Sequence, residues 1–205
     1  MVDLSIEQQF HQQGFHSVCG IDEAGRGPLA GPVYAAAVIL PDDCQIDGLD
    51  DSKKLTEKKR EALFPIIKEK ALAFGIGFAS AQEVDDINIL NATFLAMKRA
   101  TEQLSLTPDM ALIDGNLKPK MEICPEEPVI KGDAKSLSIA AASVLAKVSR
   151  DHFMLEQAKL YPEYMFQKHK GYGTKLHYER IEAYGICPLH RKSFLKKFLG
   201  EANGQ

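Results

Sequence analysis

Acidic residues stand at the ends of several short apolar segments, and this pattern constrains the fold of the chain more than any other feature. Segment 17–23, for example, is apolar and closes on two carboxylates. Carboxylates at the ends of neighbouring strands can converge in space although they are far apart in sequence. The acids placed in this way are Asp22, Glu23, Asp114 and Asp133.

The other segments alternate between strand and helix patterns. We expect strands over 17–23, 32–40, 71–80, 110–113 and 129–131, and helices over 52–70, 80–87, 88–104, 136–160, 176–184 and 192–199. The glycine- and proline-rich turn at 24–31 predicts that the first two strands form a hairpin-like pair. The chain begins with strands and continues with alternating helices and strands, and this order indicates an α/β fold with a mixed sheet and flanking helices.

Length and composition fit one domain over residues 1–205. The chain has 205 residues and is 45% hydrophobic, enough for a core without disulfide or metal staples. No apolar run approaches the roughly 20 residues of a membrane span, and the polar start has no signal-peptide core. We therefore expect a cytoplasmic protein, a monomer, with its four scattered cysteines reduced.

Charge is unevenly distributed along the chain. Residues 165–199 hold eight Lys or Arg and two Glu, a balance of +6, so the net charge of −3 leaves −9 elsewhere. We expect a basic helical extension at about 165–205, packed on the domain. Such a segment can bind phosphates, although charge alone favours a solvated helix face.

The four acids predict a metal site if they converge. Carboxylates a few ångströms apart repel one another, and divalent cations would remove that cost. Oxygen ligands without His or Cys favour Mg²⁺ or Mn²⁺ over zinc. Two such ions serve phosphoryl transfer well.

Polar and glycine-rich loops are the candidates for binding substrate. Glycines in G-R-G at 25–27 allow close backbone approach to a ligand, or form a plain hairpin turn. The segments 51–54 and 133–135 place lysines beside small polar groups. In segment 169–177 Tyr172 can stack on a sugar or base, and the two histidines, His169 and His177, are either substrate-side or structural.

Six motifs in order resemble the type 2 ribonuclease H family, and within it bacterial ribonuclease HII. They are G-I-D-E-A-G-R-G-P-L-A-G-P-V at 20–33, D-S-K-K-L at 51–55, L-I-D-G-N at 112–116, K-G-D-A-K-S at 131–136, S-I-A-A-A-S-V-L-A-K-V-S-R-D at 138–151 and H-K-G-Y-G-T at 169–174. The resemblance spans residues 18 to about 190, nearly the whole chain.

This resemblance implies a ribonuclease H-like fold, a five-stranded mixed sheet flanked by helices with a C-terminal helical region. It implies that Asp22, Glu23, Asp114 and Asp133 are both catalytic and metal-binding. It also implies that the residues touching the substrate are Gly25, Arg26, Gly27, Ser52, Lys53, Lys135, Ser136 and Tyr172. Some relatives bind the replication sliding clamp through a C-terminal motif, but the tail here gives no clear match.

The implied activity is endonucleolytic and belongs to ribonucleotide excision repair. Such an enzyme hydrolyses the RNA strand of RNA–DNA hybrids and cuts 5′ of single ribonucleotides in duplex DNA, leaving 3′-hydroxyl and 5′-phosphate ends. Two readings compete with it: a binding-only nucleic-acid module, and another two-metal phosphoryl-transfer nuclease of the same fold. Converging acids would repel phosphates in a binding-only protein, which counts against the first.

Overall fold

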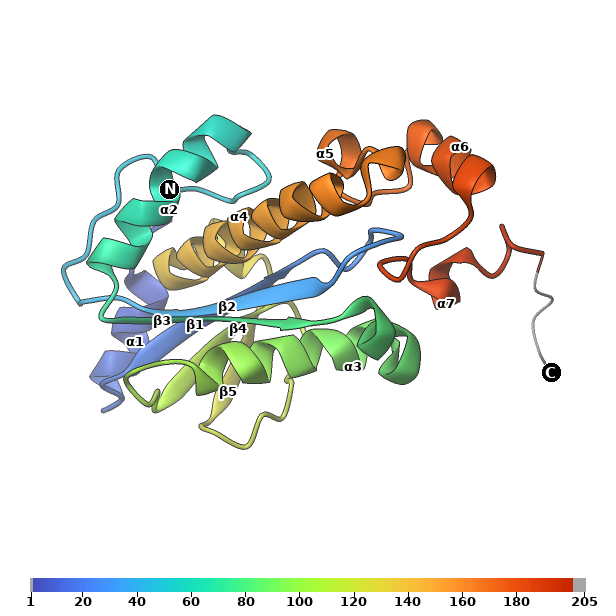
Figure 1. Cartoon of the computed structure of the whole chain (residues 1–205). Coiled ribbons are helices and arrows are strands. Elements are labelled where there is room, and N and C mark those ends of the chain that lie inside the picture. The colour runs from blue at the N-terminus through green and yellow to red at the C-terminus, as the bar shows by residue number, and fades with distance from the viewer. Residues whose placement is uncertain (1, 201–205) are drawn as a thin grey trace.

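A five-stranded mixed sheet forms the centre of the molecule, as the sequence predicts. The computed structural model describes residues 2–200, and its strands lie in the order β3-β2-β1-β4-β5 (Figure 1). Strands β1, β2 and β3 are antiparallel, whereas β4 and β5 run parallel to β1. The strand bounds are Val18–Ala24, Val33–Ile39, Ala73–Ala79, Met110–Asp114 and Glu126–Val129.

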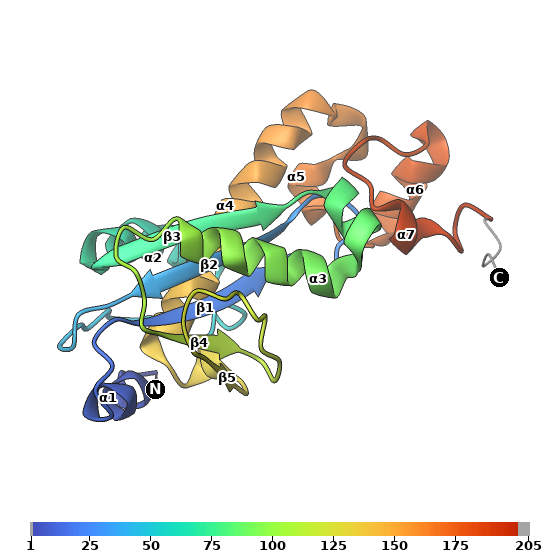
Figure 2. The same cartoon turned by 90° about the horizontal axis from the view of Figure 1, so that it is seen from below.

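Helices cover both faces of this sheet. Helix α3 (Ala81–Glu102) lies on one face, and α4 (Leu137–Leu160) crosses the other together with α2 (Glu57–Lys70) (Figures 1 and 2). Helix α1 (Ser5–Gln12) packs near the start of β1 and β4. Because both faces are buried, β1 and β2 are apolar on both sides rather than alternating with polar residues.

Polar side chains at the helix starts determine where the helices begin. Thr56 caps α2, and Ser80 forms a capping box with Glu83 at the start of α3. Ser136 caps α4 by accepting a hydrogen bond from the Ile139 amide. These residues give α2, α3 and α4 N-termini that can be read from sequence.

Several predicted boundaries are wrong. The fifth strand lies at Glu126–Val129 rather than 129–131, residues 52–56 precede α2, and α7 covers only Lys192–Leu195. The division expected between helices over 80–87 and 88–104 is confirmed, because α3 is broken at Asn88, which has φ +66°. Ile66 in α2 is 39% exposed, whereas Leu63 and Ile67 are buried.

The C-terminal segment lies beyond the end of α4, beside the β1–β2 turn (Figure 1). The segment contains a short helical turn, η2 (Pro162–Tyr164), and three helices, α5 (Phe166–His169), α6 (Lys175–Tyr184) and α7. Another short turn, η1 (Gly132–Ala134), lies before α4. Leu29 from the β1–β2 turn packs against Ile181 and Leu195. The last five residues of the predicted extension, 201–205, lie outside the described residues. Among residues 2–200, no helix is long and apolar enough to cross a membrane.

Close packing of α4 on β1 depends on Gly20. A Cβ atom at this position would stand 2.3 Å from the backbone of Ser138 and Ile139. Gly20 lies two residues before Asp22, so this approach brings the start of α4 against the strand that carries the acids.

We predict that Gly20→Ala lowers the free energy of unfolding by about 2–3 kcal/mol, because backbone atoms cannot move aside as a flexible side chain would. Gly27→Ala is the matched control, since a Cβ atom there meets nothing within 4 Å. Urea unfolding of both variants measures the difference. Equal stability of the two variants would contradict the packing argument.

Candidate active site

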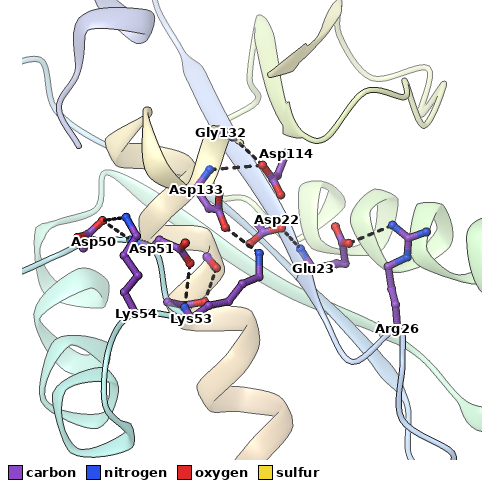
Figure 3. Close-up of polar contacts among 12 residues, drawn as sticks. Asp22, Glu23, Arg26, Asp50, Asp51, Lys53, Lys54, Asp114, Gly132 and Asp133 are labelled. Atoms are coloured by element: carbon purple, nitrogen blue, oxygen red, sulfur yellow. Dashed lines mark hydrogen bonds and ion pairs between the residues drawn. The ribbon is translucent and has the colours of Figure 1, made fainter. Parts of the chain in front are cut away.

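Three aspartates converge where strands β1, β4 and the η1 turn end. One carboxylate oxygen from each of Asp22, Asp114 and Asp133 lies within 4.8 Å of the other two (Figure 3). Asp22 is on β1, Asp114 ends β4, and Asp133 lies in η1. The parallel pairing of β1 and β4 brings the first two together, as their positions at the strand ends predict.

Backbone amides orient two of these carboxylates. Asp114 Oδ1 accepts from the Gly132 amide at 2.7 Å, and Asp22 Oδ1 accepts from the Glu23 amide at 2.7 Å. The Gly132 contact ties the end of β4 to η1, so Asp114 and Asp133 are held side by side.

Glu23 is not part of this group of three. Neighbouring residues on a strand point to opposite faces, so Asp22 faces α4 while Glu23 follows Ile21 towards the α3 side. Its Oε1 atom lies 3.4 Å from Arg26 Nη1, and Figure 3 shows Glu23 turned towards that residue. Glu23 still lines the same cleft as Asp22 and Asp114.

Burial and mutual repulsion make these carboxylates hard to ionise. Burial raises the pKa of Asp22 well above its ordinary value, and the charges of Glu23 and Asp114 raise it further. Burial raises the pKa of Asp114, and the charge of Asp133 adds to the effect. Burial also raises the pKa of Glu23, against the opposing charge of Arg26.

A lysine supplies positive charge to the cluster. Lys53 Nζ lies 2.8 Å from Asp133 Oδ2, and this hydrogen bond is the main reason that the pKa of Lys53 is raised. The Lys53 side chain is 75% exposed, whereas that of Asp133 is 6% exposed. The lysine therefore reaches in from a surface loop.

The donor set fits a divalent cation. Three buried or half-buried carboxylates offer oxygen atoms close enough to bind one centre, with raised pKa values that a bound cation would reverse. The buried aspartate triad thus indicates a divalent-metal site.

A cleft of about 400 Å³ opens in front of the aspartates. Most of the predicted substrate-contacting residues line it: Gly25, Arg26, Ser52, Lys53 and Tyr172. Gly27 is exposed beside them. The G-R-G turn and the Tyr172 loop thus border one cavity with the acids, although Gly25 and Tyr172 are 147 positions apart in the sequence.

Ser136 does not line the cleft. Its side chain is fully buried, where its hydroxyl donates to Glu7 Oε1 at 2.6 Å and caps α4. That burial argues against the predicted contact with substrate. Lys135 is exposed next to it but is not among the residues that line the cleft.

Sequence reasoning missed several residues of the site. Arg60, Ser143 and Lys147 line the cleft, and the Ser143 hydroxyl bonds both Ser52 and Asp22. Ser143 and Lys147 belong to the 138–151 motif, which is the one signal in the sequence that could have indicated them. His169 and His177, left open by the sequence, are buried away from solvent.

We predict that Asp22→Asn stabilises the metal-free protein at neutral pH. Because the pKa of Asp22 is raised in the folded state, the folded protein holds this proton more tightly than the unfolded chain does. The protonated Asp22 therefore contributes fully to the free energy of unfolding at pH values below 3.8, the ordinary pKa of the group, and this contribution is lost as the pH rises through the folded-state pKa. Removing the charge should raise Tm by about 2–4 °C at pH 7 in chelator, and by much less at pH 4. Melting curves at both pH values check this, and a lower Tm at pH 7 would contradict it.

Comparisons with known proteins identify the family of the chain. The family model described as Ribonuclease HII matches residues 19–197. Ribonuclease HII from Endomicrobium trichonymphae is 58% identical over 191 residues, which cover 93% of this chain and 91% of that protein.

Solved structures show the same architecture. The crystal structure of ribonuclease H2 from Pyrococcus horikoshii OT3 matches with a TM-score of 0.74 and 25% identity, covering 91% of this chain and 97% of that one. Bst-RNase HIII in complex with Mn²⁺ shares the fold, with a TM-score of 0.68, 22% identity, and coverage of 85% of this chain and 65% of that one. With strands, acids and cleft arranged as described, and with a family match across most of its length, the chain belongs to the ribonuclease HII family.

Proposed function

We propose that the protein is an endonuclease that hydrolyses the RNA strand of RNA–DNA hybrids and cuts 5′ of single ribonucleotides embedded in duplex DNA. The observation that carries this proposal is the convergence of Asp22, Asp114 and Asp133 at a cleft bordered by the G-R-G turn and Tyr172. Membership of the ribonuclease HII family supports it. The products would carry 3′-hydroxyl and 5′-phosphate ends.

The three aspartates would hold the catalytic cation, Mg²⁺ or Mn²⁺, and Glu23 at the edge of the cleft would complete a site for two ions. Bound cations would supply positive charge to the attacking water, the scissile phosphate and the leaving 3′-oxygen. The solved RNase HIII complex holds Mn²⁺, in keeping with oxygen-rich ligands.

Residues around the cleft would place the substrate. Lys53, Lys147 and Arg26 bring positive charge to the rim, which suits a phosphate backbone. The G-R-G turn would contact the 2′-hydroxyl that distinguishes RNA from DNA, and Tyr172, 42% exposed, offers a ring face to the next sugar.

The remaining expectations follow from this activity. A DNA repair enzyme of a bacterial family would act in the cytoplasm, on duplex DNA or a hybrid, and we expect it to act as a monomer. We propose no sliding-clamp contact, because the sequence of the tail offers no matching motif.

Cleavage of three end-labelled duplexes tests the proposal. In Mg²⁺ or Mn²⁺ we expect cuts 5′ of a lone ribonucleotide in DNA and cuts throughout an RNA–DNA hybrid, but none in an all-DNA duplex. Excess chelator should abolish both reactions. Cleavage of the all-DNA duplex would favour another two-metal nuclease of this fold, and full activity in chelator would contradict the metal site.

Asp114→Asn should reduce cleavage by at least about 100-fold while the protein stays folded, because the cation loses a charged ligand. Asp47→Asn is the matched control, since Asp47 is exposed in the loop before α2 and belongs neither to the triad nor to the residues that line the cleft. Single-turnover rates and circular dichroism of both variants make the comparison. A near-normal rate for Asp114→Asn would remove that residue from the site.

Tyr172→Ala should weaken cleavage at a single ribonucleotide by about 10-fold, through loss of stacking. Tyr184→Ala serves as its control, because Tyr184 is also exposed but lies at the end of α6 and does not line the cleft. Steady-state kinetics on the single-ribonucleotide duplex measure both. Equal rates for the two variants would leave Tyr172 without a substrate role.

A further inference from the structure

Arg191 holds the G-R-G turn from the C-terminal segment. Its guanidinium donates to the carbonyl oxygens of Gly25 at 2.6 Å, Arg26 at 2.8 Å and Gly31 at 2.9 Å. The side chain is fully buried. Backbone carbonyls of one turn are therefore its hydrogen-bond partners.

Arg150 from α4 supports the same turn. It donates to Ala30 O and Pro32 O, both at 3.1 Å, and is also fully buried. Burial, together with the nearby charge of Arg150, lowers the pKa of Arg191 to about 9. Two desolvated cations so close together are costly, and their hydrogen bonds to the carbonyl oxygens of the turn offset part of that cost.

His190, the residue before Arg191, is linked through His177 to the backbone of the Tyr172 loop. Its Nε2 atom lies 3.1 Å from His177 Nε2, and His177 Nδ1 lies 3.0 Å from Tyr172 O. A carbonyl can only accept, so His177 Nδ1 donates to Tyr172 O and its Nε2 accepts from His190 Nε2. The chain of bonds thus runs from His190 through His177 to the Tyr172 backbone.

The far end of His190 agrees with this direction. Its Nδ1 accepts from the Cys187 amide at 2.9 Å, which is shorter than the 3.3 Å to Cys187 O. Burial lowers the pKa of both His177 and His190 to about 4, so both rings are neutral at pH 7. Each imidazole therefore has one fixed tautomer.

Backbone bonds connect the same three segments. Arg191 N donates to Leu29 O and Leu29 N donates to Gly171 O, both at 2.8 Å. A Cβ atom on Gly171 would stand 2.3 Å from Ala30 O, so the two loops touch without space between them. The dipeptide His190–Arg191 sits at this junction and bonds to both.

We propose that His190 and Arg191 are positioning residues that fix the spacing between the G-R-G turn and the Tyr172 loop, and so determine recognition of a ribonucleotide followed by DNA. This inference rests on the proposed function, in which one loop contacts the ribose and the other the next deoxyribose. A uniform hybrid presents no such junction on its RNA strand, so its cleavage depends less on the spacing.

Two pairs of variants test the inference by steady-state kinetics. Arg191→Lys keeps the charge but loses the planar fork. Arg99→Lys is its control, because Arg99 also makes three side-chain hydrogen bonds, one to Phe78 O and two to the Glu83 carboxylate, and does not line the cleft. His190→Asn keeps an acceptor for the Cys187 amide but loses the donor to His177. His190→Gln can restore that donor.

We expect Arg191→Lys and His190→Asn to raise KM for the single-ribonucleotide duplex by about 10-fold, with kcat within about twofold. KM for the hybrid should change by less than about threefold, and His190→Gln and Arg99→Lys should stay near wild type. In a Tyr172→Ala background, His190→Asn should raise KM for the single-ribonucleotide duplex by less than about a further twofold, because His190 acts through the Tyr172 loop.

Folding is checked separately by calorimetric titration of Mn²⁺, whose affinity should be unchanged in each variant. If His190→Asn does not fold, Arg191→Lys carries the test alone. Equal rises in KM for both substrates, or no rise for either, would overturn the inference. If the wild type cleaves neither substrate, the proposed function fails instead.

Discussion

Repulsion among three carboxylates that the fold forces together is the constraint on which the rest of the structure depends. Asp22 and Asp133 are almost fully buried, and ionising all three without a counter-charge is unfavourable. The scaffold holds them together all the same, through the parallel pairing of β1 with β4, the Gly132 amide and the close approach of α4 at Gly20. The rigid sheet thus keeps the site in a geometry that a divalent cation relieves.

The cleft has two sides of different construction. The acids stand on strand ends in the centre of the domain, whereas the G-R-G turn and the Tyr172 loop are held by buried arginines and neutral histidines from α4 and the C-terminal segment. The first side is suited to chemistry on a phosphate and the second to the shape of the sugar. Arg150 connects the two, since α4 also carries Ser143 beside Asp22.

The sheet and most of its helices could be predicted because local signals coincide with tertiary packing. Apolar runs became strands, and Thr56 begins a helix where its side chain can cap one. The fifth strand was misplaced because the E-E-P-V segment at the sheet edge is only half-buried and lacks an apolar pattern.

The candidate site was predictable in part for the same reason. Convergence of three aspartates follows from strand ends at one sheet edge. Glu23 lies apart from them because neighbouring side chains on a strand point to opposite faces of the sheet, and the turn that follows does not bring Glu23 back to the face of Asp22. The role of Arg191 could not be seen, because positive charge in a basic segment gives no sign that the side chain is buried under a turn some 160 residues earlier.

That long connection has a consequence for how the protein is made. Gly25 and its partner Arg191 are separated by 166 positions, and contacts of this range form late and slowly. A nascent chain on the ribosome can pair its first strands early, yet the turn beside them stays without its buried guanidinium until residue 191 has left the exit tunnel. Assembly of the substrate-facing side is thereby postponed long after the turn itself has been synthesised.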